Sequence, residues 1–420
     1  MQTYLCIRQN EIMKKFEIPE FYRSPIISAV KEKRKNADPR KKDFTPSFID
    51  FGSLQFYIAR HFGFCYGVEN AIEISYKAIA ENPDKRIFLL SQMIHNPGVN
   101  EELQSHGIKF LQDTSGHQLI DWSEVNADDI VIIPAFGTSV EIEKQLKQIG
   151  VKTDAYNTTC PFVEKVWNRA EKLGQQNHTI IIHGKHNHEE TRATFSHSRQ
   201  NAPSLILKDL KEAEILADFI LGKCELDHFN KIFKGRYSEN FDPLTGLEKI
   251  GVVNQTTMLA TETAEITEFL KQTMIQKFGQ DNIKNHIADT RDTLCYATND
   301  NQSATYGLLE KEADCAIVVG GYNSSNTTHL VELLEQKFEC FFISDESKIN
   351  PDGTLLSYNI HSKKEELLTL PNSSNGPVKV IISSGASCPD AIVDRVMQKI
   401  IALNGVTMEI QSAVDKMTFG

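Results

Sequence analysis

From Phe51 to about residue 404, short apolar runs alternate with amphipathic stretches. The runs are rich in Val and Ile, and most are apolar throughout, as in strands that are covered on both faces. In the amphipathic stretches, apolar residues recur at helical spacing, for example at Val68, Ala71 and Ile72. A repeated order of strand, loop and helix predicts an α/β fold with parallel sheets. The predicted strands are 56–59, 87–90, 130–133, 179–182, 250–253, 316–319 and 378–382.

Polar loops of distinctive sequence follow six of these strands. In open parallel sheets, ligands bind beyond the carboxyl ends of the strands, so we expect these loops to contribute to one binding site. The loops read SQMIHNPGVNEEL, PAFGTSVEIEK, HGKHNHEETRATF, NQTTMLATETAEI, GGYNSSNTTHLVELL and SSGASCPDAIVDRV.

Three cysteines occur in one repeated setting, in a loop that a helical pattern follows at once. They are Cys65 in GFCYGVENAI, Cys160 in TTCPFVEKVW and Cys295 in CYATNDNQ. They are too far apart for a local CxxC clip, and the paired, closely spaced ligands of a structural zinc site are absent. Three thiolates at one centre suit an iron–sulfur cluster with one iron open to substrate. The alternative is three unrelated thiols, each a small buried residue.

The repeat predicts three similar α/β domains around a common centre, each contributing one of these cysteines. The segment 31–42 is charged and shows no clear apolar period, so we expect a solvated arm there, with a docking segment as the alternative. Met13, followed by Lys14 and Lys15, is an alternative start of the chain. The predicted division is 1–50, a partly flexible extension; 51–160, the first domain, with the Cys65 segment; 161–294, the second, with an insertion near 221–248; 295–404, the third; and 405–420, an unassigned tail.

Composition restricts the class of protein. The chain has 420 residues, 40% hydrophobic and 24% charged, as in globular proteins. Its net charge of −11 argues against non-specific nucleic-acid binding, and no apolar run approaches the ~18 residues of a membrane span. No signal-peptide pattern opens the chain, so we expect a cytoplasmic protein whose eight cysteines are thiols rather than disulfides.

The polar loops contain candidate acid–base and anion-binding groups. His95 and His188 follow predicted strands, where an imidazole can donate to a phosphate or a hydroxyl, and Glu190 is a candidate proton donor. The segments 323–328 and 385–387 precede apolar helices, whose N-terminal N–H groups favour anions. For any one of these residues, a surface histidine or ordinary helix capping is the alternative. Neither GxxxxGK[ST] nor GxGxxG occurs, which disfavours a P-loop or a Rossmann dinucleotide site.

Together these motifs resemble those of the 4-hydroxy-3-methylbut-2-enyl diphosphate reductases, the last enzymes of the non-mevalonate isoprenoid route. The resemblance runs from about Phe51 to residue 404, with the motifs in the family's order. PAFGTS, HGKHNHEETRATFSH and the insertion before NQTT are similar to the plant and cyanobacterial branch. The motifs that carry the resemblance are GFCYGVENAI, IHNPGVNEEL, TTCPFVEKVW, NHEETRAT, NQTT, CYATNDNQ, NSSNT and GASCPD.

The resemblance implies a fold and a set of site residues. The fold would be a trefoil of three α/β domains around one [4Fe–4S] cluster, held by Cys65, Cys160 and Cys295 with the fourth iron open to substrate. Glu190 would supply protons. One departure is Phe136, where many relatives carry a histidine, so one polar partner of the substrate is absent. The implied substrate-binding residues are His95, His188, Thr256, Ser324, Ser325, Asn326 and Ser387.

The implied reaction is the reductive dehydroxylation of (E)-4-hydroxy-3-methylbut-2-enyl diphosphate to isopentenyl diphosphate and dimethylallyl diphosphate. The implied electron donor is a ferredoxin- or flavodoxin-type protein. An open iron can bind an alcohol oxygen and weaken the C–O bond, while an anchored diphosphate orients the reacting end. Two alternatives stay open: an iron–sulfur hydro-lyase, which needs no net electrons, and a non-enzymatic α/β protein that binds a phosphorylated metabolite.

Overall fold

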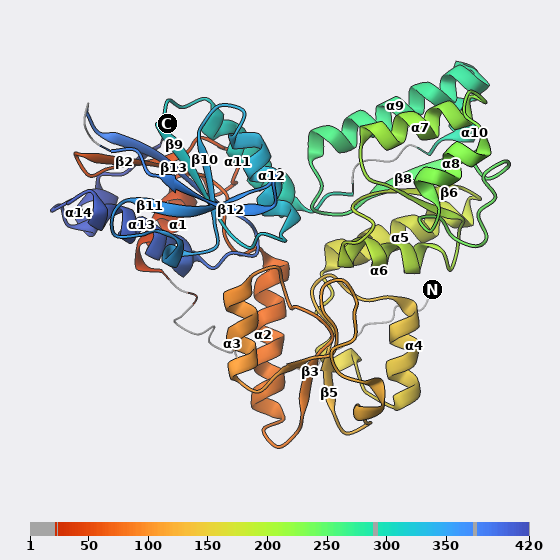
Figure 1. Ribbon diagram of the computed structural model, residues 1–420, viewed down its shortest axis with the longest axis horizontal. Helices are drawn as coiled ribbons and strands as arrows, with labels where there is room; N and C mark the ends of the chain where they lie inside the picture. Colours follow the sequence, from red (N-terminus) through yellow and green to blue (C-terminus); the bar gives the residue numbers. More distant parts are fainter. Residues whose placement is uncertain (1–21, 23, 289–292, 373–375, 420) are drawn as a thin grey trace, which may run out of the picture.

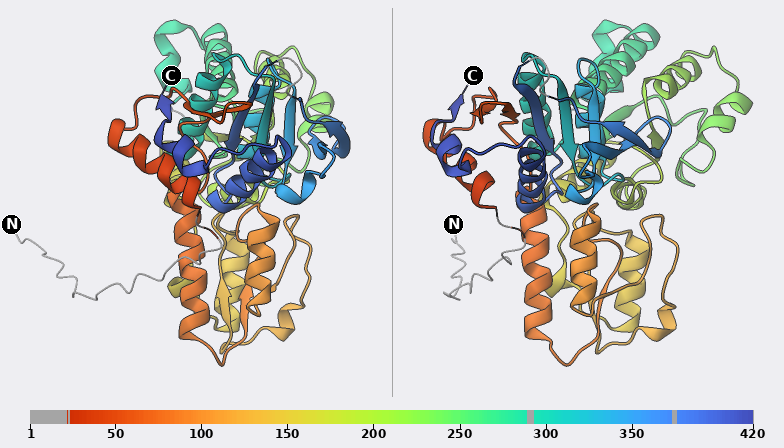
Figure 2. Two further views of the ribbon diagram at one scale, coloured as in Figure 1. Left: turned by 90° about the vertical axis from the view of Figure 1, so that its left-hand side faces the viewer. Right: turned by 60° about the vertical axis from the view of Figure 1, so that its left-hand side comes forward.

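Three α/β units build the computed structural model, which describes residue 22 and residues 24–288, 293–372 and 376–419. Figure 1 shows the units as three lobes, and the two further views in Figure 2 show the lobe of α2, α3 and α4 below the other two. Within the described residues, none of the helices combines the length and apolar character that crossing a membrane would require.

The first unit has a three-stranded parallel sheet in the order β4-β3-β5. Strands β3 and β5 are buried at every position, as expected where helices cover both faces. The elements of this unit are α2 (Tyr66–Glu81), β3 (Ile87–Leu89), α3 (Pro97–Ser105), β4 (Lys109–Phe110), β5 (Ile130–Ile132) and α4 (Val140–Ile149).

The second unit has a parallel sheet in the order β7-β6-β8. The predicted insertion near 221–248 packs into this unit, because Phe229, Phe233 and Phe241 join the core beneath α7 and α9. The elements are α5 (Pro161–Gln175), β6 (Thr179–His183), α6 (Glu189–Ser198), β7 (Ser204–Leu207), α7 (Leu210–Ile220), α8 (Leu226–Phe233), β8 (Ile250–Asn254), α9 (Ala260–Phe278) and α10 (Ile283–His286).

The third unit has a six-stranded mixed sheet in the order β10-β9-β13-β2-β1-β14, with a separate β11-β12 hairpin. The pairs from β10 to β2 are parallel, and β1 pairs antiparallel with β2 and β14. The elements are α1 (Pro25–Ala37), β1 (Ser47–Asp50), β2 (Leu54–Ile58), α11 (Tyr296–Leu309), β9 (Cys315–Val319), α12 (Ser325–Leu334), β10 (Cys340–Ile343), β11 (Thr354–Asn359), β12 (Lys364–Thr369), β13 (Val378–Ser384), α13 (Asp390–Leu403), α14 (Ile410–Asp415) and β14 (Thr418–Phe419).

The prediction of an α/β fold with several parallel sheets is confirmed, and each of the seven predicted strands is present. The predicted division began the first domain at residue 51 and so placed strand β2 in that domain, but the structure does not. Strand β2 pairs in parallel with β13, with Leu54 opposite Val378, so it belongs to the sheet of the third unit rather than the first. An apolar strand carries no local mark of the sheet that it joins, because that choice depends on pairing across more than 300 residues of chain.

The expectation of a solvated arm at 31–42 is wrong for residues 31–37, which form the second half of helix α1, whereas residues 39–42 are exposed and non-helical. Residues 1–21 lie outside the described part of the chain. Helix α1 packs against α13 and α14, as Figure 2 shows, and it buries Ile26, Ile27 and Val30. The next position on that face is Arg34, which is only 2% exposed and donates from Nη2 to the carbonyl of Thr45 at 2.8 Å. This buried guanidinium interrupts the apolar period, which is why the sequence pattern concealed the helix.

We predict that Ile27→Ala lowers the unfolding temperature, because it removes a fully buried side chain from the contact of α1 with its own unit. A loss of about 2–5 kcal/mol is typical of such a cavity. Lys35→Ala on the exposed face of α1 is the control, with an expected change within about 0.5 kcal/mol. Thermal unfolding followed by circular dichroism measures both. Equal unfolding temperatures for Ile27→Ala and the unchanged protein would show that α1 is not packed.

Candidate functional site

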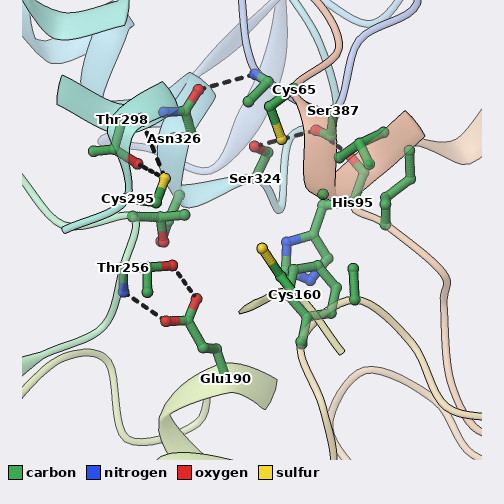
Figure 3. Close-up of a pocket in the computed structure, with 18 of the residues that line it drawn as sticks. Cys65, His95, Cys160, Glu190, Thr256, Cys295, Thr298, Ser324, Asn326 and Ser387 are labelled. Atoms are coloured by element: carbon green, nitrogen blue, oxygen red, sulfur yellow. Dashed lines mark hydrogen bonds between the residues drawn. The ribbon is translucent and has the colours of Figure 1, made fainter. Parts of the chain in front are cut away.

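A pocket lies where the three units meet, with about 670 Å³ of empty space including the part open to solvent. Residues from loops and helix N-termini of every unit line it, and Figure 3 shows their side chains facing one space. The structure brings together all eleven residues that the sequence indicated: Cys65, His95, Cys160, His188, Glu190, Thr256, Cys295, Ser324, Ser325, Asn326 and Ser387.

The three cysteines occupy equivalent positions, as the N-cap residues of α2, α5 and α11. Figure 3 shows their sulfur atoms pointing into the same part of the pocket. Gly67 lets the first two approach, because a Cβ there would lie 2.7 Å from Cys160 Sγ and 4.0 Å from Cys65 Sγ. Any other residue at this position would push a side chain between the two sulfurs.

Burial makes these thiols poor acids. It raises the pKa of Cys160 to about 11 and that of Cys295 to about 12, and it raises the pKa of Cys65 in the same way. The N–H of Thr298 donates to Cys295 Sγ at 3.3 Å and partly opposes the shift. A thiol of this kind is protonated near neutral pH unless a cation binds it. The donors therefore fit thiolates that ligate metal better than free nucleophiles.

An iron–sulfur cluster and a single metal ion require different spacings of their sulfur ligands. Zinc binds sulfur at about 2.3 Å, so its ligands crowd around one point. Across the described ranges, no three His, Cys, Asp or Glu side chains are placed to hold one ion together. In an iron–sulfur cluster each cysteine ligates a different iron, so the sulfurs stand further apart. Three convergent but separate thiols fit the cluster.

Glu190 lies in the pocket on the first turn of α6, only 1% exposed. The backbone N–H of Thr256 donates to its Oε1 at 2.5 Å, and the Thr256 hydroxyl donates to its Oε2 at 3.0 Å. Burial raises the pKa of this carboxyl to about 7, although the two hydrogen bonds oppose the shift. Near neutral pH the group can therefore hold and release a proton.

The two histidines differ in their hydrogen-bond partners. His188 is the N-cap residue of α6, and its Nδ1 accepts from the N–H of Glu190 at 3.2 Å, which places the proton on Nε2. Burial lowers the pKa of His188 well below its usual value, so the ring is neutral. His95 instead donates from Nε2 to Glu189 at 3.0 Å, and its ring stacks on Phe136 at 4.3 Å between centroids.

Hydroxyl and amide groups form a further part of the pocket wall, next to His95. Ser324 caps α12 and accepts from the hydroxyl of Thr327 at 2.9 Å, and Ser387 donates to the carbonyl of His95 at 3.2 Å. Asn326 Oδ1 accepts from the N–H of Ala386 at 3.0 Å, which ties α12 to the loop after β13. A helix N-terminus that lines a pocket, with hydroxyl groups beside it, favours an anion.

Sequence reasoning missed two polar residues that support the site. Glu189 accepts from His95 Nε2 and from the Ser91 hydroxyl, and its place in the sequence, next to Glu190, gives no sign of these distant partners. Gln255, in the NQTT motif, donates from Nε2 to the Ser325 hydroxyl at 3.2 Å. The adjacent acid in HNHEET and the amide in NQTT were the available signals, but only the tertiary structure supplies their partners.

The amino-acid sequence matches the family model described as LytB protein over residues 56–401. A protein of Synechococcus sp. (strain WH7803) named 4-hydroxy-3-methylbut-2-enyl diphosphate reductase is 40% identical over 358 residues, which cover 85% of this chain and 87% of that protein. The protein of the same name from Prochlorococcus marinus subsp. pastoris (strain CCMP1986 / NIES-2087 / MED4) is 38% identical over 388 residues, 92% of each chain.

Among solved structures, the fold is similar to that of the E-1-hydroxy-2-methyl-but-2-enyl-4-diphosphate reductase from Plasmodium falciparum. The TM-score is 0.59 at 23% sequence identity, and the match covers 84% of this chain and 88% of that chain.

Proposed function

This chain belongs to the LytB protein family, and we propose that it performs the reaction for which its cyanobacterial relatives are named, the reduction of 4-hydroxy-3-methylbut-2-enyl diphosphate. This reaction is the terminal step of the non-mevalonate pathway. The observation that carries the proposal is the convergence of three thiols, one buried acid and a hydroxyl-lined anion wall in a single pocket.

Cys65, Cys160 and Cys295 would hold a [4Fe–4S] cluster, one per chain, in a trefoil of three units. The cluster would supply electrons singly, together with an open iron that acts as a Lewis acid. We retain the predicted boundaries near residues 160 and 294, and we add 24–58 and 405–419 to the third unit, because β1, β2 and β14 share its sheet. Reduced thiols suit the expected cytoplasmic location.

The chain's own residues bind and orient the substrate. Ser324, Asn326 and Ser387 present polar groups at the N-terminus of α12, where a diphosphate is favoured by the helix dipole. The neutral ring of His188 has its Nε2–H available for a phosphate oxygen or the substrate hydroxyl. Because the anchored diphosphate fixes one end, its binding energy positions the other end for reaction.

Protons and electrons balance in the proposed reaction. Two electrons and two protons replace the C–OH bond by C–H and release water, and protonation at either end of the allylic fragment gives isopentenyl or dimethylallyl diphosphate. Glu190 would give its proton to the departing oxygen, held in place by Thr256. Phe136 lacks a polar group, so it contributes stacking to His95 rather than a hydrogen bond to the substrate.

The decisive experiment is anaerobic turnover of the allylic diphosphate with and without an added one-electron reductant, alongside visible and Mössbauer spectra. A reductase needs the reductant and shows the spectrum of a [4Fe–4S] cluster. Turnover without reductant would instead indicate a hydro-lyase. A colourless anaerobic preparation without iron would favour a non-enzymatic phosphometabolite-binding protein.

We predict that Ser324→Ala raises the KM for the diphosphate substrate about tenfold, because a hydrogen bond to a charged group typically contributes about 1.5–3 kcal/mol. The substitution also removes the cap of α12, at a cost to stability of about 1 kcal/mol. Ser139→Ala, which removes a cap of the same kind from α4 outside the pocket, controls for that effect and should leave KM unchanged. An unchanged KM in Ser324→Ala would restrict this residue to capping.

A further inference from the structure

The basic segment of residues 31–42 lies on the surface of the third unit. It contains seven Lys or Arg residues and two acids, in a chain whose net charge is −11. Lys31, Lys33 and Arg34 form ion pairs with Asp390, Asp415 and Asp43. The remaining cations are exposed, and no described residue forms an ion pair with any of them: Lys35, Arg40, Lys41 and Lys42. A protein with a net charge of −11 therefore presents a locally basic surface, with Glu69 and Asp300 as the carboxyl groups near Lys41.

A groove runs from this basic segment to the outer side of Cys65. Four cations and one acid, Asp300, line it, together with His61, whose pKa burial lowers to about 4, so that its ring is neutral. Cys65 lines the groove and also the central pocket, so this residue forms part of the wall between the two. The cations of the groove are Lys31, Lys35, Lys41 and Arg60.

Contacts on both sides of the groove fix the side chains along it. Lys31 Nζ lies over the ring of Phe62 at 4.8 Å, and Arg60 donates to the carbonyl of Asp38 at 3.3 Å. At the other side, the N–H of Tyr66 donates to the hydroxyl of Tyr296 at 3.0 Å. Those two tyrosines are 57% and 40% exposed. Tyrosine is enriched in protein-binding surfaces, and charged side chains such as Lys35 and Lys41 belong to the polar rim of such surfaces.

We propose that this groove and its basic rim dock an acidic one-electron carrier protein of the ferredoxin type. The proposal rests on the proposed function, which needs two electrons per turnover. Because electron tunnelling weakens steeply with distance, a carrier must approach a ligand of the redox centre. Cys65, a proposed cluster ligand, lines the groove, so a protein docked there would lie next to it. Two reduced carriers each lose one electron, and these reduce the substrate together with two protons.

Opposite charge makes the pairing specific. Lys35, Arg40, Lys41 and Lys42 attract an acidic surface, accelerate its encounter and orient it, and this attraction weakens as salt screens it. The donor's affinity should therefore depend on ionic strength and on this patch, whereas a small cationic dye should need neither.

The test uses the double variant Lys35→Glu/Lys41→Asn of the full cluster-containing chain. Asparagine suits residue 41 because its φ is +53°. The control is Lys147→Glu/Lys144→Asn on α4: Lys147, like Lys35, is an exposed lysine in the last turn of a helix, but in another unit. Three quantities are measured for each protein: the KM for a reduced, acidic plant-type [2Fe–2S] ferredoxin, turnover with methyl viologen, and the calorimetric Kd for oxidised ferredoxin.

We expect the first variant to raise both the KM and the Kd for ferredoxin about tenfold at low salt, with a weaker salt dependence, while turnover with methyl viologen stays unchanged. The control variant should match the unmodified protein. Unchanged KM and Kd for ferredoxin would overturn the docking site while leaving the proposed function intact. Absence of turnover with methyl viologen in the unmodified protein would contradict the proposed function, and the Kd values would still decide the docking site.

Discussion

Replacing Cys295 by serine is expected to lower turnover more than about 100-fold and to reduce the iron and sulfide bound per chain. Loss of a group that only supports a metal ligand already costs about 10–100-fold, and here the ligand itself is removed. A hydroxyl is a harder, less acidic donor than a thiol, and the position is buried enough to raise the pKa of the native thiol to about 12. Serine would therefore stay neutral and bind iron poorly.

The fold should survive this substitution. The Cys295 sulfur accepts from the N–H of Thr298 at 3.3 Å as the cap of α11, and a serine hydroxyl is a good N-cap. Cys224→Ser, in a loop outside the pocket, is the matched control and should keep full iron content and turnover. Iron and sulfide analysis, the visible spectrum and anaerobic turnover are the measurements. A Cys295→Ser protein with full iron content and turnover would refute the cluster assignment.

Replacing Glu190 by glutamine is expected to lower kcat about 100- to 1000-fold while the cluster spectrum and substrate affinity are retained, because general acid catalysis commonly contributes about 10²–10⁴-fold. Glutamine can keep both contacts with Thr256, accepting from its N–H and donating to its hydroxyl. Its amide has no acidic proton to transfer. Glu143→Gln, another carboxyl whose pKa is raised by burial but which lies outside the pocket, is the control.

The pH dependence provides a second readout for Glu190. Its folded pKa of about 7 lies above the ordinary value of 4.5, so the folded protein binds this proton more tightly than the unfolded chain. The associated stability is present below pH 4.5 and is lost as the pH rises through about 7, amounting to about 3 kcal/mol at most. Glu190→Gln should therefore unfold at a higher temperature than the unmodified protein at pH 8, and at a similar temperature at pH 4.5.

The pH dependence of turnover should also reflect the protonation state of Glu190. In the unmodified protein, kcat should fall as the pH rises above about 7, because the acid form of Glu190 is depleted. The residual activity of Glu190→Gln should lack this decline. Near-normal turnover of the variant, or an unchanged pH profile, would remove Glu190 from the proton path.

Local patterns were sufficient where a residue's role depends on its near neighbours. The strand 179–182 was predicted from a run of apolar, β-branched residues, and the structure has β6 at Thr179–His183. Cys160 was singled out because a loop of Thr and Pro precedes a helical period, and it is the N-cap of α5. The motif resemblance then indicated site residues in several units, and the structure gathers these residues in one pocket.

Long-range pairing required the tertiary structure. Nothing near Leu54 shows that β2 joins β13, and nothing near Arg34 shows that its guanidinium is buried against Thr45. The contact of His95 with Glu189 joins residues 94 positions apart in the sequence. The first two pairs form when the third unit folds, and the His95–Glu189 contact forms when the first and second units meet. The energy that favours such pairs comes from burial rather than from local preference.

The sequence by itself determined the α/β architecture, the three cysteines and the polar loops, because strand burial, helix capping and turn chemistry are recorded in adjacent residues. Only the tertiary structure decided that Cys65 separates the central pocket from a basic groove, and that α1 is part of the third unit's core. The physical reason is that enclosure, pKa and docking surfaces depend on distances between residues that lie far apart in the chain.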